Sequence, residues 1–269
     1  MHMQHSLTEY SRTLKAVAFG GLPTITTPAR RCRQPFESIV LGILVAGLLG
    51  GCTRGVDDRI NAAYAMARHP SPRNLDRIEA LLNDEDRDVR ATALVVMDPI
   101  DKVRSKRMAT AALQDPDGLV RAAAVSVAAG GGDPSQLPAL LALAVDDPVW
   151  QVRTRALDAL AAYDDPSVRE VFAEGLIDSV RHVRKAALLA GIKRPGLLPV
   201  DRLSDLVVSD PDWENRADAA RALGASNDPA ARPALEAALA DPNEFVRAVA
   251  SRERRGLPFE VAPPVSQTP

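Results

Sequence analysis

The chain has 269 residues, of which 46% are hydrophobic, 25% charged and 4% aromatic, and its formal net charge is −2. This composition indicates a folded globular chain, and the dominance of small apolar residues favours closely packed helices over a sandwich or barrel. Only Cys32 and Cys52 are cysteines, and both precede the repeats described below, which excludes a disulfide framework or a cysteine-rich zinc site there.

The N-terminal segment has the layout of an export signal. Arg30, Arg31 and Arg33 precede an uncharged apolar run at residues 39–49, and small residues follow it at 50–52. A basic stretch, about 7–15 apolar residues and a small-residue end are typical of a secretory signal peptide. Eleven apolar residues are too few for a bilayer core that requires about 20.

The string Leu49-Gly50-Gly51-Cys52 resembles the lipobox of bacterial lipoproteins. The resemblance implies that residues 1–51 are removed, that Cys52 receives a diacylglyceryl group, and that residues 52–55 form a linker to the membrane anchor. Thr53 stands where an Asp would resemble an inner-membrane retention signal, so the outer membrane is slightly favoured. Residues 1–38 are long for the charged head of a signal, and we attribute this to a start codon placed too far upstream or, as an alternative, to twin-arginine export.

The rest of the chain repeats one pattern six times between residues 84 and 250: Asp, four residues, Val-Arg, two residues, Ala. Only Asn215, which replaces a valine, departs from it. The aspartates, spaced 31 or 32 residues apart, are Asp84, Asp115, Asp147, Asp178, Asp210 and Asp241. The arginines six positions later are Arg90, Arg121, Arg153, Arg184, Arg216 and Arg247. A fixed period of this length predicts a stacked array in which each unit contacts only its neighbours.

Two helices per repeat follow from the eight Asp-Pro pairs. An Asp accepts hydrogen bonds from the free amides at a helix start, and Pro fits the first helical position. On the second helix of each unit, the recurrent Val and Ala fall on one side of the helical wheel, which predicts the buried stripe. An amphipathic helix at 56–68 caps the array, so we expect a repeat domain at 56–254 and a disordered Pro-rich tail at 255–269.

The spacing from Asp to Val-Arg resembles that of HEAT repeats, in particular the short bacterial kind that also occurs in phycobilisome lyases. The resemblance implies an all-α fold, a right-handed α-solenoid of about six two-helix repeats. It also implies that the Asp and Arg columns form a ladder of ion pairs between neighbouring repeats, which gives these residues structural roles. A row of arginines that binds anions is the alternative.

In such solenoids the second helices line the concave face, and we expect a protein partner to dock there. Trp150 and Trp213 both lie three residues after a repeat aspartate, on the side that points away from the predicted core. Arg155, Arg181, His182 and Lys185 lie between them in the sequence. Aromatic residues together with arginine are typical anchors of protein interfaces. The alternatives are that each Trp packs over a neighbouring loop and that the run from Arg181 to Lys185 is a solvated helix face.

Catalytic chemistry has little support in the sequence. After removal of the export segment only His69 and His182 remain, and neither belongs to a His-Glu motif like those of HEAT-repeat hydroxylases with a di-iron centre. Residues 1–51 hold five of the 33 basic and two of the 35 acidic side chains, which leaves 28 basic against 33 acidic ones. This acidic balance opposes nucleic-acid binding.

We therefore expect an envelope lipoprotein on the periplasmic side that acts as a protein-binding scaffold, without enzymatic activity, cofactor or metal. The alternative function is a lyase-like or chaperone-type protein that binds a tetrapyrrole or similar cofactor in the groove. A structural spacer without a partner is a third possibility.

Overall fold

The computed structural model describes residues 51–129 and 133–257, with side chains from Gly55 onward. Contacts within the chain separate residues 1–51 from a second unit, Cys52–Pro269, which contains the repeats. Regular secondary structure in the described ranges is entirely helical. The predicted export segment before residue 51 and the tail beyond residue 257 lie outside the described residues.

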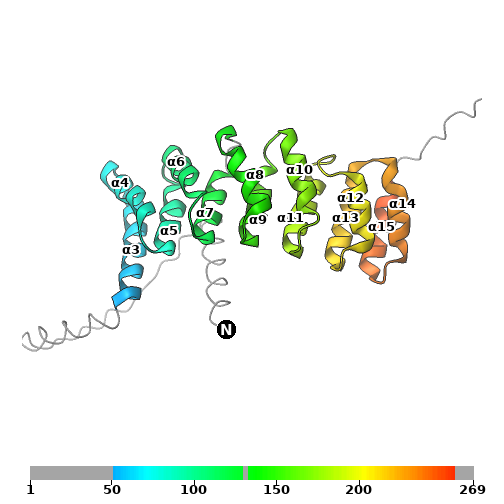
Figure 1. Cartoon of the computed structure of the whole chain (residues 1–269), viewed down its shortest axis with the longest axis horizontal. Coiled ribbons are helices and arrows are strands. Elements are labelled where there is room, and N and C mark those ends of the chain that lie inside the picture. Colours follow the sequence, from blue (N-terminus) through cyan, green and yellow to red (C-terminus); the bar gives the residue numbers. More distant parts are fainter. Residues whose placement is uncertain (1–50, 130–132, 258–269) are drawn as a thin grey trace, which may run out of the picture. The chain divides into compact units, whose positions relative to one another are not determined.

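The helices alternate between a first and a second helix in each repeat, and the pairs follow one another in chain order (Figure 1). The first helices are α4 (Pro72–Ala80), α6 (Lys102–Ala112), α8 (Leu137–Asp146), α10 (Pro166–Gly175), α12 (Val200–Ser209) and α14 (Arg232–Ala237). The second helices are α5 (Arg87–Met97), α7 (Gly118–Ala128), α9 (Trp150–Leu160), α11 (Arg181–Lys193), α13 (Trp213–Ser226) and α15 (Glu244–Gly256). Short 3-10 turns are η1 (Leu81–Asn83), η2 (Pro134–Gln136), η3 (Pro229–Ala231) and η4 (Ala238–Ala240).

The first helices begin where several Asp-Pro pairs predict. Asp133, Asp165 and Asp228 each accept a hydrogen bond from the amide two residues further on, and a Pro occupies the first turn. The Asp-Pro pairs that precede second helices behave differently, because α13 begins after Asp212 and α15 after Asn243, each of which caps its helix in place of the repeat aspartate. The repeat aspartates are engaged elsewhere, as described below.

The predicted core stripe is buried throughout the array. The six Ala of the repeat pattern and its five Val are completely inaccessible to solvent. Asn215, the exception, is also buried, and its side-chain amide donates to the carbonyl of Arg181 at 3.2 Å and to Asp210 Oδ2 at 3.4 Å. The buried amide therefore has partners, as buried polar groups require.

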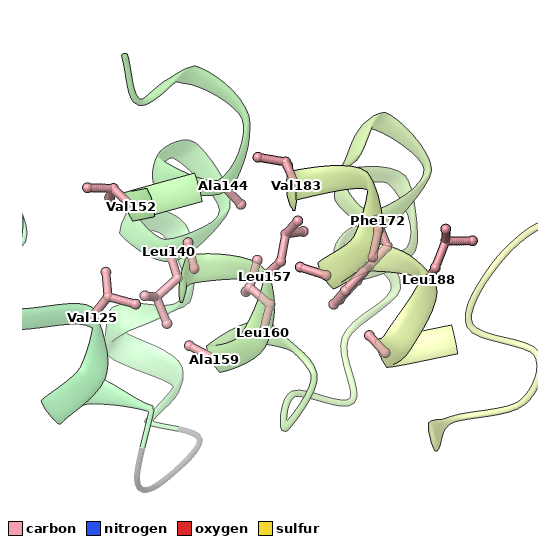
Figure 2. Close-up of a cluster of buried hydrophobic side chains, with 14 of the residues drawn as sticks. Val125, Leu140, Ala144, Val152, Leu157, Ala159, Leu160, Phe172, Val183 and Leu188 are labelled. Carbon is pink, nitrogen blue, oxygen red and sulfur yellow. The ribbon is translucent and has the colours of Figure 1, made fainter. Parts of the chain in front are cut away.

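Each second helix packs on the second helix of the next repeat, which makes one continuous interior. Figure 2 shows this interior around α9, where Leu157 and Leu160 lie among side chains of the neighbouring units. A Cβ added to Gly175 would stand 3.1 Å from Leu157 Cδ1 and 3.3 Å from Ala187 Cβ, so even an alanine there would press on the side chains of its neighbours. The α-solenoid expected from the repeat is confirmed.

Both ends of the described array extend beyond the predicted limits. Helix α3 (Gly51–Arg68) includes residues 52–55, which we expected to form a linker, and it contributes Ala63 to the core. At the other end α15 continues to Gly256, and Leu257 after it is buried. The domain therefore extends at least three residues beyond the predicted boundary at 254.

Removal of core volume between repeats is expected to destabilise the whole array. Leu157→Ala should lower the free energy of unfolding by about 2–5 kcal/mol, because it leaves a cavity between α9 and α10. Leu189→Ala is the matched control, since Leu189 on α11 is 40% exposed, and we expect a change below about 1 kcal/mol. Urea unfolding followed by circular dichroism measures both; equal losses would contradict this packing.

Candidate functional site

The repeat arginines and aspartates form a continuous series of ion pairs along the array. In each pair the arginine contacts the repeat aspartate in the turn before the next second helix. The arginine Nε and Nη2 lie 2.6–3.1 Å from the two carboxylate oxygens. The pairs are Arg59–Asp84, Arg90–Asp115, Arg121–Asp147, Arg153–Asp178, Arg184–Asp210 and Arg216–Asp241. We call these six pairs the ladder.

The five ladder arginines from Arg90 to Arg216 also hold the turn of their own repeat. Arg90 Nη1 donates to the carbonyl of Asp84 at 2.9 Å, and Arg153 Nη1 donates to that of Asp147 at 2.7 Å. The aspartates in turn accept the amide two residues further on, as Asp178 does from Val180 at 2.7 Å. One arginine therefore joins its own turn to the carboxylate of the next repeat. Bidentate pairing of this kind is the strongest and most directional form of Arg–carboxylate contact.

Bonds from the ladder arginines lower the pKa of two ladder carboxylates, Asp178 and Asp241, although burial acts in the opposite direction. The arginine side chains from Arg90 to Arg216 are 10–12% exposed. Burial alone would raise the pKa of Asp178, but the bonds from Arg153 and from the Val180 amide outweigh it, and the pKa lies below its usual range. For Asp241 the bond from Arg216 is the main cause of its lowered pKa. The guanidinium groups of the ladder are occupied within the chain, so this row is no open anion-binding strip.

The two tryptophans of the predicted binding face occupy equivalent positions but differ in exposure. The Trp150 ring stacks on His182 of the next repeat, with centroids 4.8 Å apart and an angle of 21° between the planes, and Trp150 packs partly against the core. Trp213 remains 41% exposed and meets the Phe245 ring of the next repeat edge-on at 5.7 Å. Phe245 is 45% exposed, and the Arg221 guanidinium lies 5.3 Å from its centroid.

The cations predicted for that face contact neighbouring repeats. Arg155 donates to the Ser126 hydroxyl at 2.9 Å. Arg181 pairs with Asp212, and Lys185 lies between Glu214 at 2.6 Å and Asp218 at 3.6 Å. These side chains bridge repeats, and the structure does not gather them into one basic patch.

Two residues of this face were missed by the sequence analysis. Phe245 and Arg221 lie on successive second helices, and Phe245 stands at the position that His182 occupies two repeats earlier. Superposing the repeats by their aspartates would have shown that each Trp is followed in the next repeat by a ring one position further along. We call Trp213, Arg221 and Phe245 the aromatic cluster.

The described residues offer little for catalysis. Among residues 51–129 and 133–257 no group of three His, Cys, Asp or Glu side chains is arranged to hold a metal ion. A shallow depression of about 370 Å³ lies beside α6 and is lined by Lys102, Lys106 and Arg107 together with Asp133. Two of these cations already pair with acids, Lys102 with Asp98 and Arg107 with Glu79. None of the described helices has the length and apolar character that crossing a bilayer requires.

A stack of helix pairs whose neighbours are tied by buried ion pairs defines a repeat protein of the α-solenoid class. A family model described as HEAT repeats matches residues 105–193 and 187–253, more than half of the chain. The chain therefore belongs to the HEAT repeat family, whose fold generally serves as a scaffold for protein interactions. No curated protein sequence matches the chain.

Solved structures with the same fold are only distantly similar in sequence. The crystal structure of Escherichia coli YibA is 21% identical with a TM-score of 0.55, covering 75% of this chain and 83% of that one. The archaeal HEAT-like repeats protein from Thermococcus onnurineus NA1 is 16% identical with a TM-score of 0.50, covering 74% and 91%. An engineered protein is 19% identical with a TM-score of 0.51, covering 68% and 96%. At these identities the likeness shows the fold alone.

Loss of one ladder arginine is expected to destabilise the array at neutral pH. Arg153→Met leaves the carboxylate of Asp178 buried without its partner and should lower the free energy of unfolding by about 2–4 kcal/mol. Arg169→Met is the control, because Arg169 is exposed on α10, and a change within about 0.5 kcal/mol is expected.

The loss of unfolding free energy caused by Arg153→Met should depend on pH. Since the pKa of Asp178 is lowered in the folded protein, its contribution is complete above the pKa of an unfolded Asp, about 3.9, and is lost as pH falls through the folded value. The difference between wild type and Arg153→Met should therefore shrink in urea titrations below about pH 4. A difference that stays constant down to pH 2 would rule out a role for the ionised pair.

Proposed function

We propose that this protein is a lipid-anchored scaffold of the bacterial envelope that binds another protein through the aromatic cluster. The observation that carries the proposal is that two exposed aromatic rings, Trp213 and Phe245, lie in edge-on contact across neighbouring second helices. Exposed aromatic residues flanked by arginine are the usual centres of protein interfaces.

The second-helix face surrounds this cluster with side chains that are fixed by contacts between repeats. Lys185, Glu214 and Asp218 form ion pairs on the α11 side, and Arg221 pairs with Asp218 while it covers the Phe245 ring. A rim of satisfied charges around an apolar centre matches the anatomy of protein interfaces, and the fixed side chains lose little conformational entropy on binding. Trp150 and His182, stacked on each other and partly buried, offer less surface to a partner.

The anchor rests on residues 39–52, in which a short apolar run leads to Leu-Gly-Gly-Cys. Acyl chains on Cys52 would hold the array at the membrane, because each buried methylene contributes about 0.8 kcal/mol and several chains together anchor stably. The outer membrane is the favoured site, since Thr53 replaces the Asp of the retention signal.

Removal of the exposed rings should abolish partner capture. The full chain is expected to retain a discrete set of proteins from envelope extract. The double variant Trp213→Ala with Phe245→Ala should retain at least tenfold less of them, because a few aromatic residues carry most of the binding energy of an interface. The control is Val103→Ala, because Val103 is 77% exposed on α6, away from the second helices. Equal capture by both variants would contradict the site, and specific uptake of a tetrapyrrole by the purified chain would favour the lyase-like alternative.

The anchor has its own test. Cys52→Ser removes the thiol that would be acylated, so the protein should move from the membrane to the soluble fraction after cell breakage, and labelling with radioactive palmitate should disappear. The control is Cys32→Ser, which lies before the predicted cleavage point and should change neither readout. Membrane association that persists in Cys52→Ser would contradict the lipoprotein.

A further inference from the structure

Within the described residues, the last arginine of the repeat pattern, Arg247, has no carboxylate bound to its Nε and Nη2. Arg247 lies in the first turns of α15, and its Nη1 donates to the carbonyl of Asp241 at 2.7 Å and to that of Pro242 at 3.0 Å. Among the residues that the structure describes, no further repeat follows whose aspartate would meet Nε and Nη2. Arg247 is exposed, whereas the side chain of Arg153 inside the array is only 11% exposed.

The open atoms are held in the orientation that binds a carboxylate elsewhere in the chain. Arg121 Nη1 makes the same two bonds, to the carbonyls of Asp115 at 2.8 Å and of Pro116 at 3.0 Å, while its Nε and Nη2 bind Asp147 at 2.6 and 2.9 Å. Because a guanidinium is planar and rigid, fixing Nη1 also fixes the direction of the other two donors. We propose that Arg247 forms a carboxylate-binding site at the C-terminal end of the array, filled by an acidic turn of a partner protein.

The ladder indicates which carboxylate fits. Every ladder carboxylate also accepts the amide two residues further on, as Asp147 does from Val149 at 2.8 Å. The preferred ligand is therefore an Asp in the turn before a helix, which presents its two oxygens side by side. A Glu or a mobile acidic tail lacks that second hydrogen bond and is oriented less well.

The repeat aspartates of a second copy of this chain do not supply that carboxylate. All six repeat aspartates, from Asp84 to Asp241, are already paired with an arginine of the same chain. At the N-terminal end, Arg59 occupies the ladder position of α3, and the residue six places earlier is Thr53 instead of Asp. Head-to-tail stacking of copies would place Thr53, which has no carboxylate, at the ladder position opposite Arg247. Such stacking therefore does not fill the site.

The charge of the terminal helix favours an acidic partner. Helix α15 carries four arginines and two glutamates. Arg252 pairs with Glu253 and Arg254 with Glu236, while Glu244 lies exposed in the first turn. The net positive charge of α15 attracts an acidic turn at a distance. The oriented Nε and Nη2 donors of Arg247 then select a carboxylate that presents both oxygens to them.

Nitrogen-15 NMR of the arginine Nε–H groups in the full chain tests the site directly. The Arg247 signal is identified by its absence in Arg247→Lys, which keeps the charge and loses the fork. The probes are acetate and a peptide with the sequence of residues 115–120, Asp-Pro-Asp-Gly-Leu-Val. We expect saturable shifts of the Arg247 signal alone, with the ladder signals unmoved. The same peptide with Asp115→Asn should bind about tenfold more weakly.

Several outcomes would overturn the proposal. One is an Arg247 signal that neither acetate nor the peptide moves at concentrations up to about 100 mM, the range in which a charge-assisted contact is expected to bind. Another is a larger shift with inorganic phosphate than with the peptide at equal concentration, which would assign the fork to phosphate. A third is a signal that moves on Glu260→Gln in the absence of any probe, because the chain's own carboxylate would then be the occupant.

Discussion

The bridge from one repeat's arginine to the next repeat's aspartate is the contact on which the order of this array depends. Apolar side chains of about the right size are enough to bury area between repeats, but a single well-ordered arrangement needs more specific contacts. The bridge has a single satisfied geometry: two carboxylate oxygens, two guanidinium donors and a carbonyl behind them. Buried ion pairs add little net stability compared with apolar replacements, but removal of one partner is strongly destabilising because it leaves a buried charge unpaired. Specification of spacing and orientation is therefore the role we assign to the ladder.

The same arrangement decides which surface remains for recognition. Two cations on the second-helix face, Arg181 and Lys185, form pairs with the next repeat, because α13 has Asp212 at its N-cap and Glu214 in its first turn. Side chains remain free to bind a partner where the repeat pattern ends or where aromatic residues interrupt it. In the described ranges these places are the rings of Trp213 and Phe245 and the open fork of Arg247. A function in binding follows from this distribution more readily than a function in catalysis.

Most of the fold could be predicted because the sequence repeats. A Val or Ala that recurs at the same place in every unit has the same neighbours in every unit, so one helical wheel gives the whole buried stripe. Contacts between units were harder to predict. Arg59 joins the ladder although α3 lacks the Asp of the pattern, and the first-turn acids that hold Arg181 and Lys185 lie about 30 residues away in sequence. Phe245 was missed because a single aromatic in a polar helix has no helical periodicity; only alignment of the repeats by their aspartates relates it to Trp213 of the preceding repeat.

A double-mutant cycle tests most directly whether the ladder couples adjacent repeats. Arg153→Met and Asp178→Ala are measured singly and together by urea unfolding, beside the control pair Arg153→Met and Asp241→Ala, whose residues lie in non-adjacent units. The account predicts a coupling free energy of about 1–3 kcal/mol for the first pair and additivity within about 0.5 kcal/mol for the second. Additive effects for the first pair, or equal coupling for both, would contradict it.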